Sequence, residues 1–352
     1  MNRYLLFCLL LMALLKTTHA TAANLSEKPR TEGDWKGCVI GMYPSNGNVT
    51  LKKGDLQEVD DFTATVGKAP GSVVWFPTWD DPFPLEACQK LHQHGIIPHL
   101  TWEIFQPSKN PNNCDQTGPQ GYTGFNDLLN GRYDAYIDQF ASDAKSFGER
   151  VLIRFLHEFN GNWYVWSGNK NGREDGGPKK VVAAWKYVVD RFNALGADNV
   201  KWLWVPHGPS IDLSTEDWND VANYWPGDAY VDRIGLDAYN FYPQDPWGGT
   251  RPYRDFDNCF RALYDTCSKL GTQPMMIAEF GTGEFEYNNF NKATWIREAF
   301  LKIRTEYPRI RIFTWFNIKK ELDWRVDSSP EALRAFQEAV QDPYFISSPY
   351  RQ

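Results

Sequence analysis

The chain alternates short apolar runs with longer stretches of mixed polarity. The runs are nearly continuous in apolar side chains, which is typical of strands that are buried on both faces of a parallel sheet. They are CVIGMY (38–43), SVVWFP (72–77), IIPHLTW (96–102), VLIRFLHE (151–158), VKWLWVP (200–206), VDRIGLDAY (231–239), PMMIAEFG (274–281) and IRIFTWFNI (310–318). Eight runs with helical stretches between them predict an α/β fold, a single (β/α)8 TIM barrel, rather than a β-sandwich.

The stretches between the runs have the spacing of amphipathic helices. Residues 132–148 place their apolar side chains on one helix face, and residues 293–303 repeat this pattern. Four stretches end in glycine just before the next run, where a left-handed C-cap is expected. These glycines are Gly95, Gly148, Gly196 and Gly271. Ser329, followed by Pro330, is expected to begin a last helix.

The connections after the apolar runs are longer than those before them. The long ones cover residues 105–124, 167–179 and 240–254, whereas a helix is joined to the next strand by a few residues only. In a (β/α)8 barrel the loops after the strands lie at the C-terminal face, where such folds carry their active sites. No linker and no second domain is visible, so we expect one catalytic barrel over residues 24–346.

Residues 1–20 have the features of a secretory signal peptide. They combine a basic start with an apolar run from Tyr4 to Leu15, and the small residues Ala20 and Ala23 suit cleavage after residue 20 or as late as 23. The run is too short to favour a membrane anchor. We therefore expect a secreted, extracellular protein that has no membrane contact after cleavage.

Composition narrows the class of partner. With 42% hydrophobic and 23% charged residues the chain can build a large core. Its formal net charge of -7 lacks the basic footprint that nucleic-acid binding requires, so no nucleic acid is expected. No set of residues has the spacing of metal ligands, so no metal is expected. No phosphate-binding glycine loop follows the first run, so we expect no cofactor. We expect a monomer.

Five cysteines follow the signal segment. Cys259 and Cys267 lie in residues 255–271, whose apolar spacing predicts a helix, and eight helical residues separate two Cα atoms by about 12 Å. That distance exceeds the reach of a disulfide bond, so this pair is expected to be unbonded. We favour a bridge between Cys88 and Cys114.

Two glutamates end predicted strands, Glu158 in the run 151–158 and Glu279 in the run 274–281. Glycoside hydrolysis needs one carboxylic acid that protonates the leaving oxygen and a second carboxylate that attacks the sugar or activates water. A single glutamate at a barrel rim is more often just the partner of an ion pair. Two of them at strand ends, among tryptophans, favour the hydrolytic interpretation.

The motif HEFNGNWYVW at residues 157–166 resembles the hallmark of glycoside hydrolase family 26, the β-mannanase family, in a clan of retaining glycosidases with (β/α)8 barrels. The resemblance covers essentially the whole mature chain. It implies that Glu158 is the general acid/base and Glu279 the nucleophile, with carboxyl groups about 5 to 5.5 Å apart. The acid role requires a pKa of Glu158 that is raised by burial and by the neighbouring carboxylate.

The resemblance also implies residues that bind the sugar. They are His99, His157, Trp163, Tyr239 and Trp315. Among them, Tyr239 would hydrogen-bond the nucleophile, and Trp315 would form the floor beneath the reacting sugar. Trp102 ends a predicted strand and is a further candidate to stack on a sugar along the cleft. Asp237 lies two residues before Tyr239 on the same strand face.

The leading hypothesis is an endo-β-1,4-mannanase that hydrolyses mannan or glucomannan with retention of configuration. The segment WYVWSG departs from the common mannanase pattern and is closer to relatives that act on mixed-linkage β-1,3-1,4-glucan. A mixed-linkage glucanase is therefore the alternative, and a β-1,3-xylanase comes third. A non-catalytic polysaccharide-binding protein is the alternative of another class, and the presence of both carboxylates argues against it.

Overall fold

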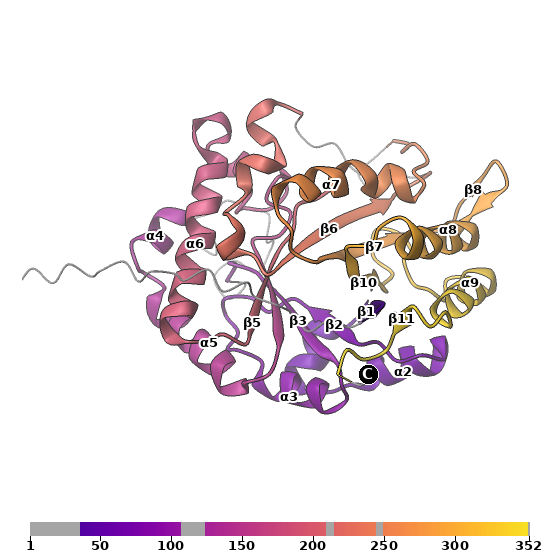
Figure 1. Cartoon of the computed structure of the whole chain (residues 1–352), viewed down its shortest axis with the longest axis horizontal. Helices are drawn as coiled ribbons and strands as arrows, with labels where there is room; N and C mark the ends of the chain where they lie inside the picture. Colours follow the sequence, from indigo (N-terminus) through magenta and orange to yellow (C-terminus); the bar gives the residue numbers. More distant parts are fainter. Residues whose placement is uncertain (1–35, 107–123, 209–214, 244–248, 351–352) are drawn as a thin grey trace, which may run out of the picture. The chain divides into compact units, whose positions relative to one another are not determined.

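The computed structural model describes residues 36–106, 124–208, 215–243 and 249–350. Over these ranges, eight parallel strands form a closed barrel, as the sequence predicts (Figure 1). The barrel strands are β1 (Cys38–Tyr43), β2 (Ser72–Trp75), β3 (Ile97–Trp102), β4 (Val151–Phe155), β5 (Val200–Trp204), β6 (Arg233–Asn240), β7 (Met275–Thr282) and β10 (Ile310–Phe316). Strand β10 pairs with both β7 and β1, and this second pairing closes the barrel. The unit Met1–Glu32, with the predicted signal peptide, lies outside the described residues.

Helices alternate with the strands and cover the barrel. The α-helices of the described residues are α1 (Gly47–Thr50), α2 (Gln57–Val66), α3 (Leu85–Gln93), α4 (Phe125–Leu129), α5 (Asp134–Phe147), α6 (Gly177–Leu195), α7 (Phe256–Leu270), α8 (Lys292–Thr305) and α9 (Pro330–Val340). Short 3-10 helices are η1 (Leu51–Lys53), η2 (Gly168–Asn171), η3 (Arg173–Asp175), η4 (Asp217–Asn219), η5 (Val221–Tyr224) and η6 (Asp228–Tyr230). A hairpin of β8 (Glu286–Tyr287) and β9 (Phe290–Asn291) follows β7, and β11 (Phe345–Ile346) pairs with β1.

Left-handed glycines occur at three of the four predicted positions. They are Gly95, Gly148 and Gly196, with φ of 76°, 77° and 72°. Gly271, after α7, is extended with φ of -159°, so the left-handed cap predicted there is wrong. A Cβ added at Gly271 would lie 2.1 Å from the end of the flexible Gln273 side chain and 2.8 Å from Cζ2 of Trp225. The side chain of Ser329 caps α9, as predicted.

The interior of the barrel is filled in layers. An apolar layer consists of Val39, Ile97, Leu152, Leu203, Val205, Met276, Ala278 and Ile312. Closer to the C-terminal ends of the strands come the buried polar side chains of Thr101, Arg154 and Asp237, from β3, β4 and β6. Buried polar groups are costly unless they are paired within the protein. The change from apolar to polar therefore marks the end of the barrel where a site is built.

Strand β7 departs from regular pairing beside this polar layer. Leu236 of β6 pairs with Ile277, whereas Asp237 pairs with Glu279, so Ala278 is an extra residue on β7. Ala278 packs in the apolar layer inside the barrel, and strict alternation would direct the next side chain outward. The bulge lets Glu279 face the interior as well, next to Asp237.

The cysteines are partly as predicted. Cys259 and Cys267 are free thiols buried in α7, which confirms that they are unbonded. Cys88 is also free and lies fully buried in α3, so the predicted bridge to Cys114 is wrong; Cys114 itself lies outside the described residues. Burial in the core raises the pKa of the Cys88 thiol, which keeps the thiol protonated and unreactive.

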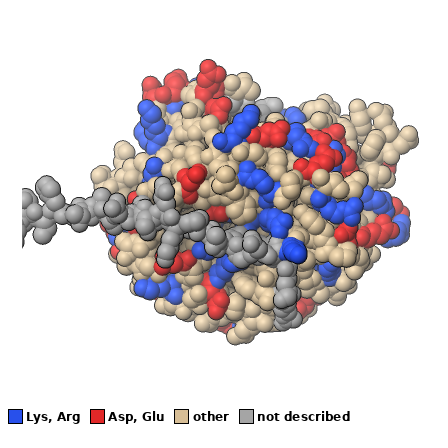
Figure 2. All heavy atoms as spheres, in the orientation of Figure 1, with Lys and Arg blue, Asp and Glu red and all other residues tan. Residues whose placement is uncertain are grey.

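Figure 2 shows acidic and basic side chains interspersed over the face in view. Many surface charges form exposed pairs, such as Arg297 with Glu338 at 3.0 Å. Exposed pairs of this kind contribute at most about 1 kcal/mol each, so the barrel depends on its interior for stability. None of the helices within the described ranges is long and apolar enough to cross a membrane.

We predict that Gly235→Ala destabilises the barrel by about 1–3 kcal/mol, since overpacking a filled core forces neighbours to move. An added Cβ at this interior position of β6 would lie 2.5 Å from Val205 Cγ2. Chemical denaturation of the purified variant measures the loss. Gly124→Ala is the matched control, because a Cβ there meets nothing within 4 Å. A Gly235→Ala variant as stable as this control would contradict the packing described.

Candidate active site

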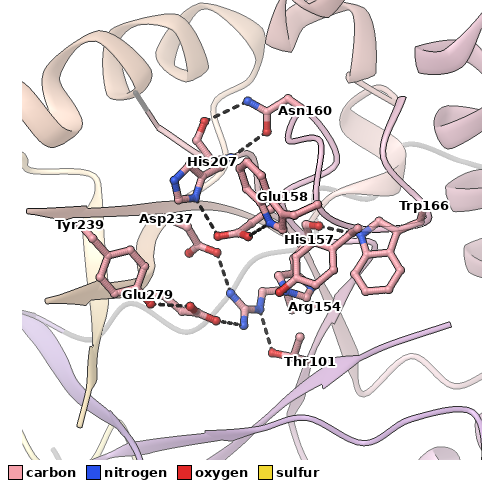
Figure 3. Close-up of polar contacts among 12 residues, drawn as sticks. Thr101, Arg154, His157, Glu158, Asn160, Trp166, His207, Asp237, Tyr239 and Glu279 are labelled. Carbon is pink, nitrogen blue, oxygen red and sulfur yellow. Dashed lines mark hydrogen bonds and ion pairs between the residues drawn. The ribbon is translucent and has the colours of Figure 1, made fainter. Parts of the chain in front are cut away.

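The chain turns sharply where it leaves β4. Leu156 and Glu158 both have left-handed backbone angles, with φ of 50° and 52°. Such angles are costly for residues other than glycine and persist only where surrounding contacts hold them. The amide of Glu158 donates to the carbonyl of Val205 at 2.7 Å, and the Asn160 side chain makes two hydrogen bonds with the backbone of His207, at 2.8 and 2.9 Å. These bonds attach the turn to the end of β5 (Figure 3).

Both carboxylate oxygens of Glu158 are engaged. The indole nitrogen of Trp163 donates to Oε2 at 2.7 Å, and Nδ1 of His207 lies 2.7 Å from Oε1. Glu158 and His207 are buried, whereas the ring of Trp163 remains partly exposed beside the carboxylate. Trp163 therefore orients Glu158 and presents an aromatic surface next to it.

The pKa of Glu158 differs from the sequence-based expectation. Burial raises the pKa, as expected. The charge and hydrogen bond of His207, together with the hydrogen bond from Trp163, outweigh this rise and lower the pKa to about 2. The expectation of a raised pKa is therefore wrong for the unliganded chain. Sequence reasoning did not foresee His207, which supplies the opposing charge.

Arg154 occupies the centre of the polar layer and is fully buried. Its Nε donates to Thr101 Oγ1 at 2.8 Å, Nη1 donates to Asp237 Oδ2 at 2.7 Å, and Nη2 donates to Glu279 Oε1. The ring of Phe76 lies 5.4 Å from the guanidinium carbon, a cation–π distance. Burial lowers the pKa of Arg154, but Glu279 and Asp237 raise it above its ordinary value, so the side chain stays charged.

Glu279 is held from two sides. Arg154 donates to one oxygen, and the hydroxyl of Tyr239 donates to the other at 2.6 Å. Carboxylate oxygens of Glu158, Asp237 and Glu279 lie within 4.8 Å of one another. This trio has the spacing of metal ligands, and it is the one such group in the described part of the chain. Arg154 already brings positive charge to two of the three carboxylates.

The two predicted histidines are buried. His157, beside Glu158, has Nε2 at 2.9 Å from the Tyr164 hydroxyl, and its carbonyl accepts from the indole of Trp166 at 2.8 Å. Its Nδ1 has no hydrogen-bond partner among the described residues. His99 lies deeper on β3, where neither ring nitrogen has a partner within the described ranges and burial lowers its pKa well below the ordinary value. At 0% exposure His99 does not reach the surface that a sugar would contact.

Trp102 does not contribute to the site. Alternate residues of a strand face opposite sides, and Thr101 faces the barrel interior, so Trp102 faces the helices. Its ring stacks on Phe140 of α5 at 4.2 Å, its indole nitrogen donates to Tyr136, and its exposure is 0%. The prediction that Trp102 binds sugar is wrong.

Trp315 also faces away from the barrel interior, because alternate residues of a strand face opposite sides. It lies between the barrel and α9, 5.4 Å from the ring of Phe336, and its indole nitrogen donates to the carbonyl of Trp324 at 2.7 Å. It is fully buried, so the prediction that it forms the floor beneath the sugar is wrong. Phe316 faces the barrel instead, and its ring and that of Trp324 lie 5.8 and 5.0 Å from Tyr239.

The structure adds residues that the sequence analysis did not single out. Arg154 lies in the middle of the run 151–158, His207 directly follows the fifth run, and Glu103 directly follows the third. All of them lie in or just after a strand that leads to the C-terminal face. A survey of every polar residue at those strand ends would have included them.

The molecule is thus a (β/α)8 barrel with a buried carboxylate cluster at the C-terminal ends of its strands. The sequence profile for Glycosyl hydrolase family 26 matches residues 118–310. Over 306 residues the chain is 38% identical to Endoglucanase H of Acetivibrio thermocellus, an alignment that covers 86% of this chain and 30% of that protein. The chain therefore belongs to glycosyl hydrolase family 26, which confirms the resemblance.

Other relatives are more distant. The chain is 27% identical over 228 residues to a mannan endo-1,4-beta-mannosidase of Bacillus subtilis, an alignment that covers 61% of this chain and 51% of that protein. The chain thus spans 30% and 51% of the length of these two curated relatives. The solved catalytic domain of Bacillus sp. JAMB-750 GH26 Endo-beta-1,4-mannanase has a TM-score of 0.64 at 18% identity, with 88% of this chain and 87% of that one covered. This likeness confirms the barrel fold.

We predict that Arg154→Met lowers the free energy of unfolding by roughly 3–5 kcal/mol at pH 7, because Asp237 and Glu279 would lose the buried cation that binds both of them. Burial raises the pKa of Asp237 and Arg154 opposes this rise, so the variant would lose the opposing charge. A carboxyl whose pKa is raised on folding costs stability mainly at pH values above its unfolded pKa. The deficit should therefore shrink towards pH 4. Urea unfolding at both pH values measures it.

Arg297→Met is the control for this variant, since its partner Glu338 is exposed and the pair contributes at most about 1 kcal/mol. A loss in Arg154→Met no larger than in this control, or one independent of pH, would contradict the role given to Arg154.

Proposed function

We propose that the chain is a glycoside hydrolase that acts with retention of configuration. The observation that carries the proposal is the separation of Glu158 and Glu279, whose closest oxygens lie within 4.8 Å. Retaining enzymes place their two carboxyl groups about 5–5.5 Å apart, whereas inverting enzymes need about 6.5–9.5 Å to admit a water molecule between carboxylate and sugar. The separation favours direct attack by a carboxylate.

Glu279 is the proposed nucleophile. Arg154 and Tyr239 hold one oxygen each, which fixes the orientation of the carboxylate. In the first step a Glu279 oxygen bonds to the anomeric carbon as the bond to the leaving oxygen breaks, and Glu158 gives that oxygen a proton. In the second step Glu158 takes a proton from water, which attacks the same carbon and releases Glu279.

Glu158 must carry a proton in the first step, although it is ionised in the unliganded chain. The Nδ1 to Oε1 contact with His207 provides the route, because a proton can pass along this 2.7 Å hydrogen bond. Substrate excludes water from the pair, and a less polar surrounding disfavours the two separated charges relative to the neutral pair. We therefore treat Glu158 and His207 as one proton-holding unit.

Two polysaccharides are candidate substrates, and the comparisons favour each differently. The relative of 38% identity is named an endoglucanase, and the WYVWSG segment agrees with a β-glucan. The relatives named mannan endo-1,4-beta-mannosidases and the family motif agree with mannan or glucomannan. We propose β-glucan as the first candidate substrate, supported by the higher identity of the endoglucanase relative, and mannan as the second. The partly exposed ring of Trp163 is the proposed stacking surface for the sugar.

We further propose that the mature enzyme is secreted and acts as a monomer.

We predict that purified mature protein releases reducing sugar from mixed-linkage β-glucan, or from mannan and glucomannan, and that Glu158→Ala and Glu279→Ala each lower kcat by at least about a hundredfold, a loss typical of general acid–base groups. Glu286→Ala is the matched control, an exposed carboxylate in the hairpin after β7. Activity that survives in Glu279→Ala, or no activity of the wild type on any of these polymers, would contradict the proposal.

A proton NMR spectrum recorded in the first minutes of hydrolysis tests the stereochemistry. We predict that the β-anomer of the new reducing end accumulates before mutarotation, because two displacements at one carbon restore its configuration. Initial accumulation of the α-anomer would show inversion and would refute the assignment of Glu279 as nucleophile.

A further inference from the structure

Glu103 is an acidic residue at the mouth of the barrel that the mechanism above does not use. On β3 the interior positions alternate through Ile97, His99 and Thr101, and the same parity continues to Glu103. Its backbone is still paired as in a strand, because its amide donates to the carbonyl of Pro77 at 3.0 Å. Its side chain therefore follows that of Thr101 on the interior side, at the C-terminal end of the strand.

The carboxyl of Glu103 belongs to the same electrostatic cluster as the proposed catalytic pair. It interacts with Arg154, Glu279, Lys320 and Glu158, which come from four different segments of the barrel. Arg154, however, has its donors directed to Thr101, Asp237 and Glu279, and none to Glu103. Glu103 is thus near the guanidinium without helping to bind it.

Glu103 differs from the other carboxylates of the cluster because it lacks a partner. Glu158, Asp237 and Glu279 each accept at least one hydrogen bond from a side chain, whereas the Glu103 carboxyl accepts none from any residue in the described ranges. It is also only partly buried, so part of the residue remains accessible to solvent. A polar group of this kind is satisfied by water or by a ligand.

The protonation state of Glu103 suits a sugar. Burial raises its pKa to about 8, the charges of Glu279 and Glu158 raise it too, and Arg154 and Lys320 oppose the rise. At neutral pH the carboxyl is therefore mostly protonated and can donate one hydrogen bond and accept others. Sugar hydroxyls also donate and accept, so a neutral carboxyl can pair with them without bringing another negative charge next to Glu279.

We infer that Glu103 binds substrate, by hydrogen bonds to hydroxyl groups of the sugar on the non-reducing side of the cleaved bond. This side is the one whose anomeric carbon meets Glu279, and Glu103 follows Thr101 on β3, beside the Arg154 guanidinium that donates to both Thr101 and Glu279. The inference rests on the proposed function, because it places Glu103 relative to that reaction. It assigns Glu103 a role in holding the sugar, with no part in proton transfer to the leaving group.

Kinetics of Glu103→Ala and Glu103→Gln on the polymer that the wild type hydrolyses test the inference. Glu103→Ala should lower kcat/KM by about ten- to hundredfold, the effect of losing hydrogen bonds to a buried polar partner. Glu103→Gln mimics the protonated carboxyl and should lose less. The ratio of kcat/KM for Glu103→Gln to that of the wild type should rise as pH passes about 8, since only the wild type ionises there. Glu286→Gln is the control and should match the wild type.

Thermal unfolding separates binding from a structural role. A carboxyl whose pKa is raised on folding costs stability above its ordinary value of 4.5, and the cost grows as pH rises towards about 8. Glu103→Gln should therefore raise the melting temperature by a few degrees at pH 8 and leave it unchanged near pH 4. A structural role predicts lower melting temperatures for both variants instead.

The outcomes are distinguishable. A wild type inactive on every polymer refutes the proposed function and this inference with it. If the wild type is active, any one of three results overturns the inference alone. In the first, Glu103→Ala changes kcat/KM by less than about twofold. In the second, the ratio of kcat/KM between Glu103→Gln and the wild type does not change with pH, and in the third, the melting temperature falls in both variants. Lower kcat/KM together with a higher melting temperature for Glu103→Gln at pH 8 supports it.

Discussion

The buried guanidinium of Arg154 is the interaction on which the rest of the site depends. It lies inside the barrel with 0% exposure and bonds both Asp237 and Glu279, so it brings positive charge to two carboxyl groups that lie away from water. A buried ion pair of this kind adds little net stability, because desolvation offsets much of the attraction. The ion pairs of Arg154 instead hold the two carboxylates in place, since the rigid, planar guanidinium fixes the angle between them.

Two irregularities of the backbone place the carboxylates opposite each other. The extra residue Ala278 on β7 brings Glu279 to the interior, and the left-handed angles of Leu156 and Glu158 direct the chain across the end of β4. Both features cost free energy in a barrel that is otherwise regular. They coincide with the residues proposed to carry the chemistry, as expected where strain is maintained for function.

The apolar runs were sufficient to predict the barrel, because continuous buried strands and amphipathic helices leave little choice of architecture. Glu158, Glu279 and Tyr239 were also found, since a polar group that ends such a run lies at the mouth of the barrel. Trp102 and Trp315 were misplaced because a strand turns alternate side chains to opposite sides, and the strand start that sets this parity is not marked in the sequence. The contact of His207 with Glu158 could not be predicted, because the two residues follow different strands and meet only in the folded barrel.

In the site each proposed catalytic carboxyl has fixed partners. Glu279 is paired with Arg154 and Tyr239, while Glu158 is paired with His207. The two glutamates would be interchangeable by chemistry alone. Their different surroundings support the different roles proposed for them, as is general for pairs of carboxylates in hydrolases.

The proposed mechanism requires a covalent bond between Glu279 and the sugar. Activated 2-deoxy-2-fluoro disaccharides of the gluco and manno series slow the second displacement and should trap such an adduct for peptide mass spectrometry. We expect time-dependent inactivation and a mass increase of one fluorinated disaccharide unit on the peptide that contains Glu279. A label on Glu158 or on another side chain, or turnover of these reagents with no adduct at all, would contradict it.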